Sequence, residues 1–466
     1  MIVFQSLLLI VVAVGLLNGT LAVIVAVISL YQSAAGARSA HDSADDKLPV
    51  IIGTPFVSVH VATHNEPPTM VIATLSALSR LEYPNFEVIV IDNNTADHAL
   101  WQPVADHMAQ LGNRFRFVHA DGVTGAKAGA LNIALKMTDP QAHYIAIVDA
   151  DYQVTPDFLS FATVSCAEGL DFVQFPQSYR RSEGAEAVCS ELRDYFAIFP
   201  AAANRTGASL LTGTLSLISA ASLRRVGGWP TGSITEDAEL GVTLWHAGAR
   251  GRYVDRIVGH GLLPLDLAGL RQQRRRWAAG NVQTLLYSVV GKGAILRPGV
   301  VAIVAQLTAW TNFLAVPLAT LALIAGLRLA GVADHALMTA AQIIAVVTIG
   351  LTLATISVRA FASGRGGALL ATMAMIWTSS FGWLPALFGR QLIFHRTPKI
   401  VESQALSTLS IETVASLIAL AIAAFFALEG AWLTSAIVAL SASGLLAGFK
   451  VNHDLKRAAR APKCTA

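Results

Sequence analysis

Apolar residues form long unbroken runs at the two ends of the chain and short alternating runs between them. The first 37 residues carry no charged side chain, and residues 6–32 read SLLLIVVAVGLLNGTLAVIVAVISLYQ. A helix needs about 20 apolar residues to cross a bilayer, so this run predicts a transmembrane anchor over residues 1–37. The alternative is a cleaved signal peptide, because SAAGARSA offers small residues after the run. Against it, the chain lacks a basic leading segment, and its apolar core exceeds the ~7–15 residues of a signal peptide.

Between residues 50 and 297 the pattern changes to short apolar strands separated by helical segments. The expected strands read FVSVHVAT, FEVIVID, RFRFVHA, HYIAIVDAD and DFVQF, and segments such as GAKAGALNIALKM show helical spacing. Alternation of strand and helix predicts an α/β fold, with a mostly parallel sheet covered by helices. In such sheets ligands bind beyond the carboxyl ends of the strands, so we look there for a site.

Three of the expected strands end in polar residues. The first ends in THNE at Glu66, the second in DNN beginning at Asp92, and the fourth in DAD, which contains Asp149 and Asp151. Two carboxylates at this spacing can bind Mg²⁺ or Mn²⁺ while the metal keeps phosphate oxygens as further ligands. Taken alone, such a pair more often caps a loop.

Two expected helices begin with residues that could meet a charged substrate. Lys127 lies among small residues at a helix start, where backbone N–H groups and one ammonium can face a diphosphate. Close helix packing would explain the same small residues. Glu236 and Asp237 follow Thr235 in the first turn of another helix, where acids also act as ordinary N-terminal caps.

The run RQQRRRWAAG supplies Gln273, Arg276 and Trp277. A tryptophan can stack on a sugar ring while a neighbouring guanidinium holds phosphate. The simpler interpretation is a solvated basic face close to a membrane. The residue types alone leave both interpretations open.

Composition supports a membrane protein that carries a water-exposed domain. Of 466 residues, 54% are hydrophobic and 14% charged, and the mean hydropathy is +0.55. The net charge of +3 is small, and basic residues gather at the ends of apolar runs, which argues for topology and against nucleic-acid binding. The three cysteines show no paired spacing, which suggests neither a disulfide framework nor a zinc site.

In order and spacing, these motifs resemble the family 2 glycosyltransferases of the cellulose synthase and hyaluronan synthase type. The matching pieces are an aspartate after the second strand, the DxD, the TED and the QxxRW, with GAKAGALN and LTGTLSLI as further pieces. The resemblance covers roughly residues 50–400 and implies a GT-A fold that binds a nucleotide sugar. The positions that carry it are Asp92, Lys127, Asp149, Asp151, Gly213, Thr214, Thr235, Glu236, Asp237, Gln273, Arg276 and Trp277.

The resemblance also implies roles for these positions. Glu66 and Asp92 would contact the nucleotide, Lys127 and Arg276 would hold the diphosphate, and Asp149 with Asp151 would bind nucleotide and Mg²⁺ or Mn²⁺. Asp237, within the TED of Thr235 and Glu236, would be the general base that deprotonates the acceptor hydroxyl, so that attack inverts the anomeric carbon. The acceptor would lie at Gln273, Trp277, Gly213 and Thr214, with Trp277 as its floor.

A later segment, FHRTPK, resembles the gating loop FxVTxK of the same type of enzyme. Phe394, Thr397 and Lys399 occupy the matching places, while Arg396 replaces the usual valine. A lid at this point would bond the diphosphate and exclude water from the donor. The alternative is cationic anchoring to lipid headgroups.

Nucleotide sugars are cytosolic, which would place the catalytic domain in the cytosol of a bacterial-type inner membrane and the N-terminus outside. Apolar segments after Arg297 then predict four further crossings, with basic clusters on the inner side. Residues 367–389 contain polar residues and a proline, so we expect an interfacial or re-entrant element there, with a full crossing as the alternative. The predicted organisation is an anchor at 1–37, a GT-A domain at 50–297, two transmembrane helices at 298–361, an interfacial helix and gating-loop-like segment at 367–400, two transmembrane helices at 408–450 and a basic tail at 451–466.

Three functions are compared on this basis. The first is a processive synthase that transfers a hexose from UDP-glucose or a similar donor to a growing β-glycan and exports the glycan. Accessory export proteins are candidate partners of such a synthase. The second is a transferase that adds one or a few sugars to a membrane lipid or lipid-linked acceptor. The third, a transporter or receptor, would make all four motifs coincidental, and no charged residue lies mid-span as a transporter often requires.

Overall fold

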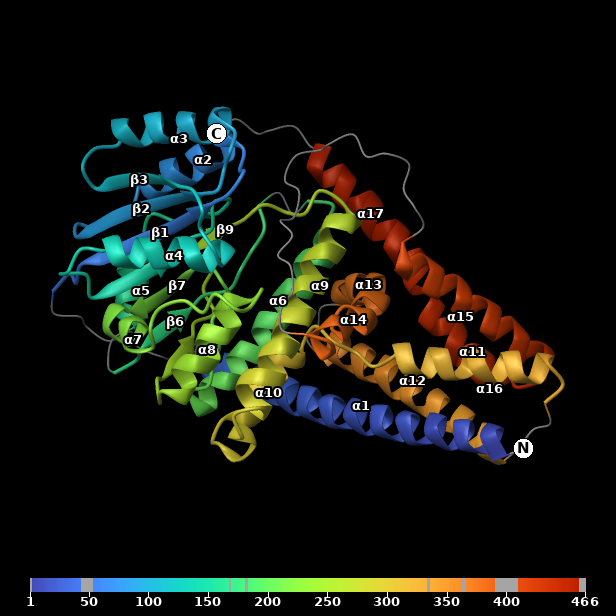
Figure 1. Cartoon of the computed structure of the whole chain (residues 1–466). Coiled ribbons are helices and arrows are strands. Elements are labelled where there is room, and N and C mark those ends of the chain that lie inside the picture. The colour runs from blue at the N-terminus through green and yellow to red at the C-terminus, as the bar shows by residue number, and fades with distance from the viewer. Residues whose placement is uncertain are drawn as a thin grey trace.

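A computed structural model describes residues 2–42, 53–166, 169–180, 183–332, 336–362, 366–389 and 410–460. It shows an α/β domain beside a bundle of long apolar helices (Figure 1). Helices α6 (Glu186–Ala203) and α9 (Leu267–Thr284) lie between the two parts. The gating-loop-like residues Phe394, Thr397 and Lys399 lie outside the described residues.

The domain is built on a seven-stranded sheet of order β3-β2-β1-β4-β7-β6-β8. Pairing is parallel for β1 with β2 and β4, for β2 with β3 and for β6 with β8, while β7 runs antiparallel to both of its neighbours. The strands are β1 (Val57–Thr63), β2 (Phe86–Asn93), β3 (Phe115–Ala120), β4 (Tyr144–Ile147), β6 (Phe172–Gln174), β7 (Ser216–Ser219) and β8 (Gly251–Tyr253), and a separate pair joins β5 (Gln153–Val154) to β9 (Gly259–His260). The predicted mostly parallel α/β fold is therefore confirmed.

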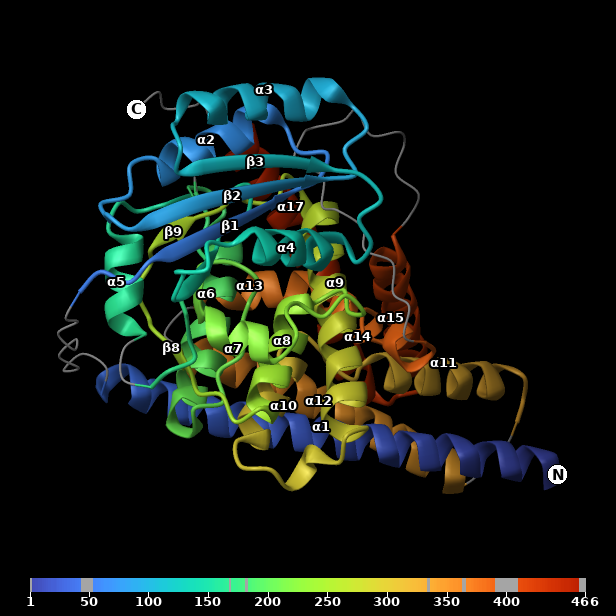
Figure 2. The ribbon, with the colours of Figure 1, turned by 60° about the vertical axis from the view of Figure 1, so that its left-hand side comes forward.

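Helices cover the sheet on both sides, as Figure 2 shows for α3 and α4. Strands β1 and β2 are almost entirely buried, and their β-branched side chains make up much of the domain core, together with Phe158 and Phe175. The domain helices are α2 (Pro68–Leu78), α3 (His98–Gln110), α4 (Ala126–Met137), α5 (Phe158–Ser165), α7 (Ala220–Arg225) and α8 (Glu236–His246).

Four helical runs within the described residues are long and apolar enough to cross a membrane. They lie in α1 (Ile2–Asp42), α12 (Ala336–Ala362), α15 (Ile411–Leu428) and the consecutive α16 (Trp432–Ala442) and α17 (Gly444–Arg460). Large apolar side chains stay exposed along them, for example Leu17 on α1 and Val347 on α12. Such surfaces are expected to face lipid.

The crossing expected just after Arg297 is not one continuous helix. It consists of α10 (Val300–Thr308) and α11 (Ala315–Leu329), separated by a short non-helical stretch. Asn312 in this stretch donates from Nδ2 to the Ile376 carbonyl at 2.8 Å, and its own carbonyl accepts from Trp383 Nε1 at 3.0 Å. Backbone outside a helix can lie among membrane helices only when its polar groups are bonded in this way.

Both contacts of Asn312 reach the segment that the sequence marks as interfacial or re-entrant. There α13 (Gly367–Ala374) is followed by the run Ile376–Leu387, which consists of α14 (Ile376–Phe381) and a short 3-10 turn (Leu384–Leu387). The two parts are bent by 54° relative to each other. The bend is compatible with a broken span or a re-entrant loop. The predicted division of the chain at these segments stays a prediction.

Candidate active site

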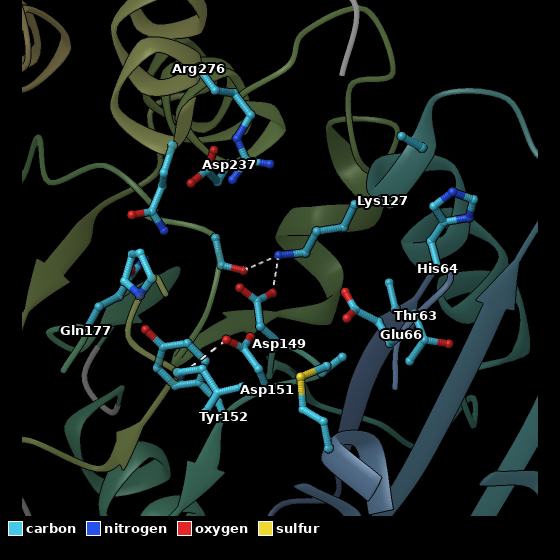
Figure 3. A pocket seen from close by; sticks show the side chains of 18 of the residues that line it. Thr63, His64, Glu66, Lys127, Asp149, Asp151, Tyr152, Gln177, Asp237 and Arg276 are labelled. Carbon is cyan, nitrogen blue, oxygen red and sulfur yellow. Dashed lines mark hydrogen bonds and ion pairs between the residues drawn. The ribbon is translucent and has the colours of Figure 1, made fainter. Parts of the chain in front are cut away.

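A cleft of about 1370 Å³ lies at the carboxyl ends of β1 and β4, between the sheet, α4, α8 and α9. Figure 3 shows His64 and Glu66 on one side of it, Asp237 and Arg276 on the other, and Lys127 with Asp149 between them. It brings together most of the predicted site residues, namely Glu66, Lys127, Asp149, Asp151, Gly213, Thr235, Glu236, Asp237, Gln273, Arg276 and Trp277. These residues are far apart along the chain, and folding brings them together in one cleft.

Lys127 links the acids of the cleft. Its Nζ donates to the Gly213 carbonyl at 2.7 Å, forms an ion pair with Asp149, and lies 3.8 Å from Glu236 Oε1. Burial by itself would lower the pKa of Lys127, but the carboxylates of Asp149, Glu236 and Asp237 outweigh it and raise the pKa. Lys127 is therefore a fixed positive charge at the centre of the cleft.

Two glycines allow this close arrangement. Gly125, the residue before α4, has φ +81°, and a Cβ there would lie 2.6 Å from the Thr231 side chain. Gly213 has φ +85°, and a Cβ there would lie 3.0 Å from Asp237 Oδ2. Both the left-handed backbone and the short distances favour glycine at these positions.

Asp237 has the properties of a base that can act near neutral pH. It lies in the first turn of α8, beside Glu236, as the sequence predicts. Burial and then repulsion from Glu236 raise its pKa to about 7, although Lys127 and Arg276 oppose the shift. A carboxylate with a pKa close to ambient pH can accept a proton and release it again, which general-base catalysis requires.

Asp149 and Asp151 place carboxylate oxygens in the cleft just after β4. The Asp149 backbone N–H donates to Thr214 Oγ1 at 3.0 Å, and Asp151 Oδ2 accepts from the Leu262 N–H at 3.2 Å. Thr214 is itself buried and supports Asp149 from behind the cleft wall. No group of three or more acid, histidine or cysteine side chains suited to a metal occurs within the described part of the chain. Two carboxylates fit a Mg²⁺ or Mn²⁺ ion that takes its other ligands from phosphates and water.

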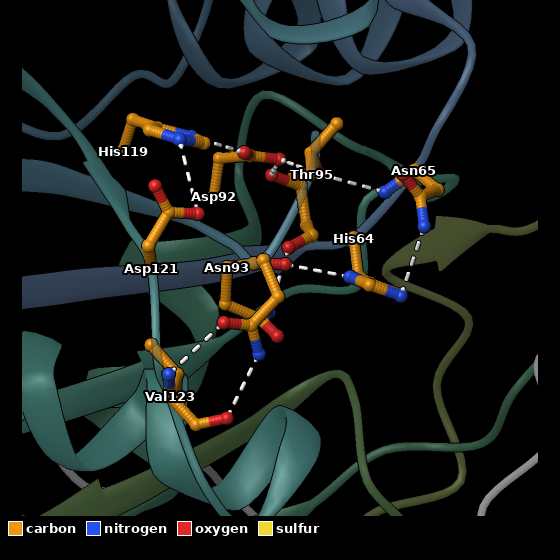
Figure 4. Close-up of polar contacts among 10 residues, drawn as sticks. His64, Asn65, Asp92, Asn93, Thr95, His119, Asp121 and Val123 are labelled. Atoms are coloured by element: carbon orange, nitrogen blue, oxygen red, sulfur yellow. Dashed lines mark hydrogen bonds and ion pairs between the residues drawn. The ribbon is translucent and has the colours of Figure 1, made fainter. Parts of the chain in front are cut away.

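Asp92 lies outside the cleft lining, in contrast to the other predicted nucleotide contacts. Its Oδ1 accepts from Thr63 Oγ1 at 2.9 Å and from Thr95 Oγ1 at 2.8 Å, and its Oδ2 lies 2.8 Å from His119 Nδ1 (Figure 4). Thr95 in turn accepts from the Asn65 N–H at 2.9 Å, where the backbone is left-handed with φ +51°. Asp92 thus holds the THNE turn in place, and its predicted nucleotide contact stays a prediction.

Several cleft residues escaped the sequence analysis. His64 bonds through Nδ1 to the Asn93 carbonyl at 2.6 Å, which makes Nδ1 the protonated nitrogen. Gln177, Tyr179 and Arg180 enter from the segment after β6. Since β6 runs in the same direction as β4, its carboxyl end reaches the same edge, and the strand-end rule could have found these three residues.

At the far end of the cleft, α9 presents Gln273, Arg276 and Trp277. The Trp277 ring lies 5.0 Å from that of Trp310, which in turn stacks on Tyr195 of α6 at 4.7 Å. The aromatic floor is thus packed against the helices that join the domain to the bundle. This end of the cleft could receive the apolar face of a sugar.

Comparison with known proteins agrees with this geometry. The sequence model of the family described as glycosyltransferase like family 2 matches residues 54–280. A cellulose synthase catalytic subunit (UDP-forming) of Xanthomonas axonopodis pv. citri is 28% identical over 49% of this chain and 32% of its own length. A poly-β-1,6-N-acetyl-D-glucosamine synthase of Staphylococcus epidermidis is 29% identical over 49% and 55%, and glucomannan 4-β-mannosyltransferase 7 of Arabidopsis thaliana is 26% identical over 50% and 43%. The chain therefore matches a third to about half of the length of these relatives.

Proposed function

Residues 54–280 form a family 2 glycosyltransferase domain of the cellulose synthase-like type, and from this premise we propose that the protein transfers a hexosyl group from a nucleotide sugar to a growing β-glycan. The observation that carries the proposal is one cleft that holds Lys127, the Asp149–Asp151 pair, Asp237 and Trp277. In this proposal Lys127 binds the diphosphate and the Asp149–Asp151 pair binds the metal. Asp237 accepts the proton of the reacting hydroxyl, and Trp277 contacts the sugar ring. Relatives named for glucose, mannose and N-acetylglucosamine polymers leave several donors to test, with UDP-glucose as our first choice.

In the proposed mechanism Asp237 removes the proton from the acceptor hydroxyl as that oxygen attacks the anomeric carbon. The attack comes from the face opposite the nucleoside diphosphate and inverts the configuration. Lys127 and Arg276 stabilise the negative charge that develops on the departing diphosphate. Fixed cations in a partly buried cleft do this better than mobile water, because they need no reorganisation during the reaction.

We further propose that Asp149 and Asp151 hold a divalent cation together with the donor phosphates. When bound, Mg²⁺ or Mn²⁺ would add a Lewis acid that neutralises charge on the diphosphate. Asp149 pairs with Lys127 in the structure, so the ammonium already provides one positive charge beside it. We propose that Glu66, which lines the cleft, contacts the nucleotide directly. Asp92 would act indirectly, by holding the THNE turn in place.

The experiment supplies membranes that contain the protein with radiolabelled UDP-glucose, UDP-N-acetylglucosamine or GDP-mannose and sizes the product. We expect one donor to give a high polymer that a β-specific glycanase degrades. A short, solvent-extractable glycoside would instead indicate the second function, transfer to a lipid or lipid-linked acceptor. In either case Asp237→Asn should reduce transfer by roughly 10²–10⁴-fold with donor binding retained. Near-normal transfer by that variant would remove Asp237 from its role.

A further inference from the structure

The sequence motif QxxRW leaves Arg274 without a role, yet this side chain is the largest that is fully buried in the described part of the protein. It forms an ion pair with Glu191 of α6, through Nη2 at 2.6 Å and Nε at 3.2 Å to the same Oε2. Both partners are buried, since Arg274 is 1% and Glu191 8% exposed. Replacement by apolar side chains of similar size often leaves stability unchanged or raises it, so stability is a weak reason for such a pair.

The guanidinium also contacts both tryptophans at the far end of the cleft. Its central carbon lies 4.4 Å from the ring centroid of Trp277 and 4.6 Å from that of Trp310. A desolvated guanidinium over an indole face is attracted by the ring's electron density. Arg274 therefore fixes where the two rings lie relative to α6 and α9.

Arg274 makes a third contact, with Gln273. Its Nη1 donates to Gln273 Oε1 at 2.8 Å. Because a guanidinium can only donate, this contact fixes the amide oxygen of Gln273 on the side of Arg274. The amide nitrogen is then the Gln273 atom left to donate to a ligand in the cleft.

We propose that Arg274, held by Glu191, is a positioning residue for the acceptor sugar, which fixes Gln273 and Trp277 in their binding geometry. The proposal rests on the proposed function, because it takes the Gln273–Trp277 end of the cleft as the acceptor subsite. Arg274 itself lies behind that subsite and does not line the cleft. It would act on the acceptor through the side chains that it contacts, chiefly Gln273 and Trp277.

The decisive variant is the apolar double substitution Arg274→Met/Glu191→Met. It leaves no unpaired charge, so a purely structural pair would be replaced without functional loss. A positioning pair would not be replaced, because Met donates no hydrogen bond to Gln273 and places no cation on the indoles. We expect the KM for a soluble β-linked tetrasaccharide acceptor to rise about tenfold while the KM for the nucleotide sugar stays unchanged.

A ligand-free measurement accompanies the kinetics. The Trp277 and Trp310 rings, 5.0 Å apart and inclined by 52°, should give an exciton couplet in the far-ultraviolet circular dichroism, identified as the signal lost in Trp310→Phe. We expect the couplet to weaken in the double variant. If no donor is incorporated by the wild type, the proposed function fails, and the couplet still decides whether Arg274 fixes the rings.

The matched control is Arg256→Met/Asp157→Met. Arg256 also combines an ion pair, with Asp157, and an aromatic contact, 3.9 Å from the Phe161 ring centroid, but it lies outside the cleft lining. Its acceptor KM should equal that of the wild type. If the double variant does not fold, Arg274→Lys replaces it in the same measurements. We expect this variant to raise the acceptor KM by a smaller factor. An unchanged acceptor KM, an equal rise in both KM values, or an intact couplet in the folded Arg274 variant would overturn the proposal.

Discussion

At the scale of single residues, the pKa of Asp237 bears most directly on the proposed mechanism. Burial and Glu236 raise this pKa to about 7. The folded protein then binds a proton at Asp237 that the unfolded chain, with a carboxyl pKa of about 4, has lost at the same pH. Between these two values the contribution of Asp237 to the free energy of unfolding falls as pH rises. Above pH 7 Asp237 is ionised, which is the less stable form and the one proposed to accept the proton.

The pH dependence of transfer should follow from this. We expect kcat/KM to rise with pH through an inflection near 7 and to level off above it, because only ionised Asp237 accepts the proton. Glu236→Gln removes one cause of the shift and should move the inflection to lower pH. Glu239→Gln is the control, since it changes the same charge on the same helix outside the cleft lining. An inflection that stays in place in Glu236→Gln would contradict the electrostatic explanation.

The positions of site residues could be predicted from the sequence where they follow from the ends of strands and the starts of helices. Lys127, Asp149 and Asp237 lie where the alternation of strands and helices predicts them. Asp92 shows the limit of this reasoning. Its position after β2 was correctly expected, but its side chain is held by Thr95 and by Thr63 and His119, and only folding brings the last two to it. The rule that ligands bind beyond the carboxyl ends of parallel strands predicts at which edge of the sheet a residue lies. It does not predict the direction of the side chain.

At the scale of elements, the contact between α8 and α9 couples two motifs that are distant in the sequence. Gly280 lies on α9, one turn beyond Trp277, and faces the residue that precedes α8. A Cβ at Gly280 would lie 2.4 Å from Thr235 Oγ1 and 3.0 Å from Ile234 Cγ1. The absence of a side chain at Gly280 therefore sets how closely the first turn of α8, with Asp237, approaches the Gln273–Trp277 end of the cleft.

Gly280→Ala should separate these two helices. We expect overpacking to cost about 1–3 kcal/mol of stability and to displace Asp237, so that transfer falls more than donor binding does. Thermal unfolding and the ratio of transfer rate to donor affinity measure the two effects. Gly326→Ala in α11 is the control, because a Cβ there meets nothing within 4 Å. Equal activity of both variants would show that this contact does not position Asp237.

Elements were predicted unevenly, for physical reasons. Strands β1 to β4 and β6 lie in apolar runs of the sequence. In contrast, β7 begins and ends in serine and β8 contains a glycine and an arginine, so neither gives a comparable apolar run. The break between α10 and α11 was not predicted, because hydropathy stays high across it. In the structure, Asn312 in this break donates to the Ile376 carbonyl of α14 and accepts from Trp383, which follows α14.

At the scale of the whole molecule, the number of membrane crossings determines on which side each terminus lies. Four apolar helical runs are long enough to cross within the described residues. The broken α10–α11 segment and the bent α13–α14 pair each could add one more. We predict that α10–α11 crosses and the bent pair does not, which gives five crossings and places the two termini on opposite sides.

Reporter fusions to the two termini test this count. A reporter that is active only outside the cytosol should work at the N-terminus, and one that folds only in the cytosol should work at the C-terminus, beside the basic residues Lys456, Arg457 and Arg460. A second pair of fusions, inserted between α9 and α10 and again between α12 and α13, should both report the cytosol, because exactly two crossings separate them. Termini on the same side would mean that the bent pair crosses as well or that α10–α11 does not, and the internal fusions distinguish these two cases. The first case would keep the domain on its predicted cytosolic side and would make the number of crossings six.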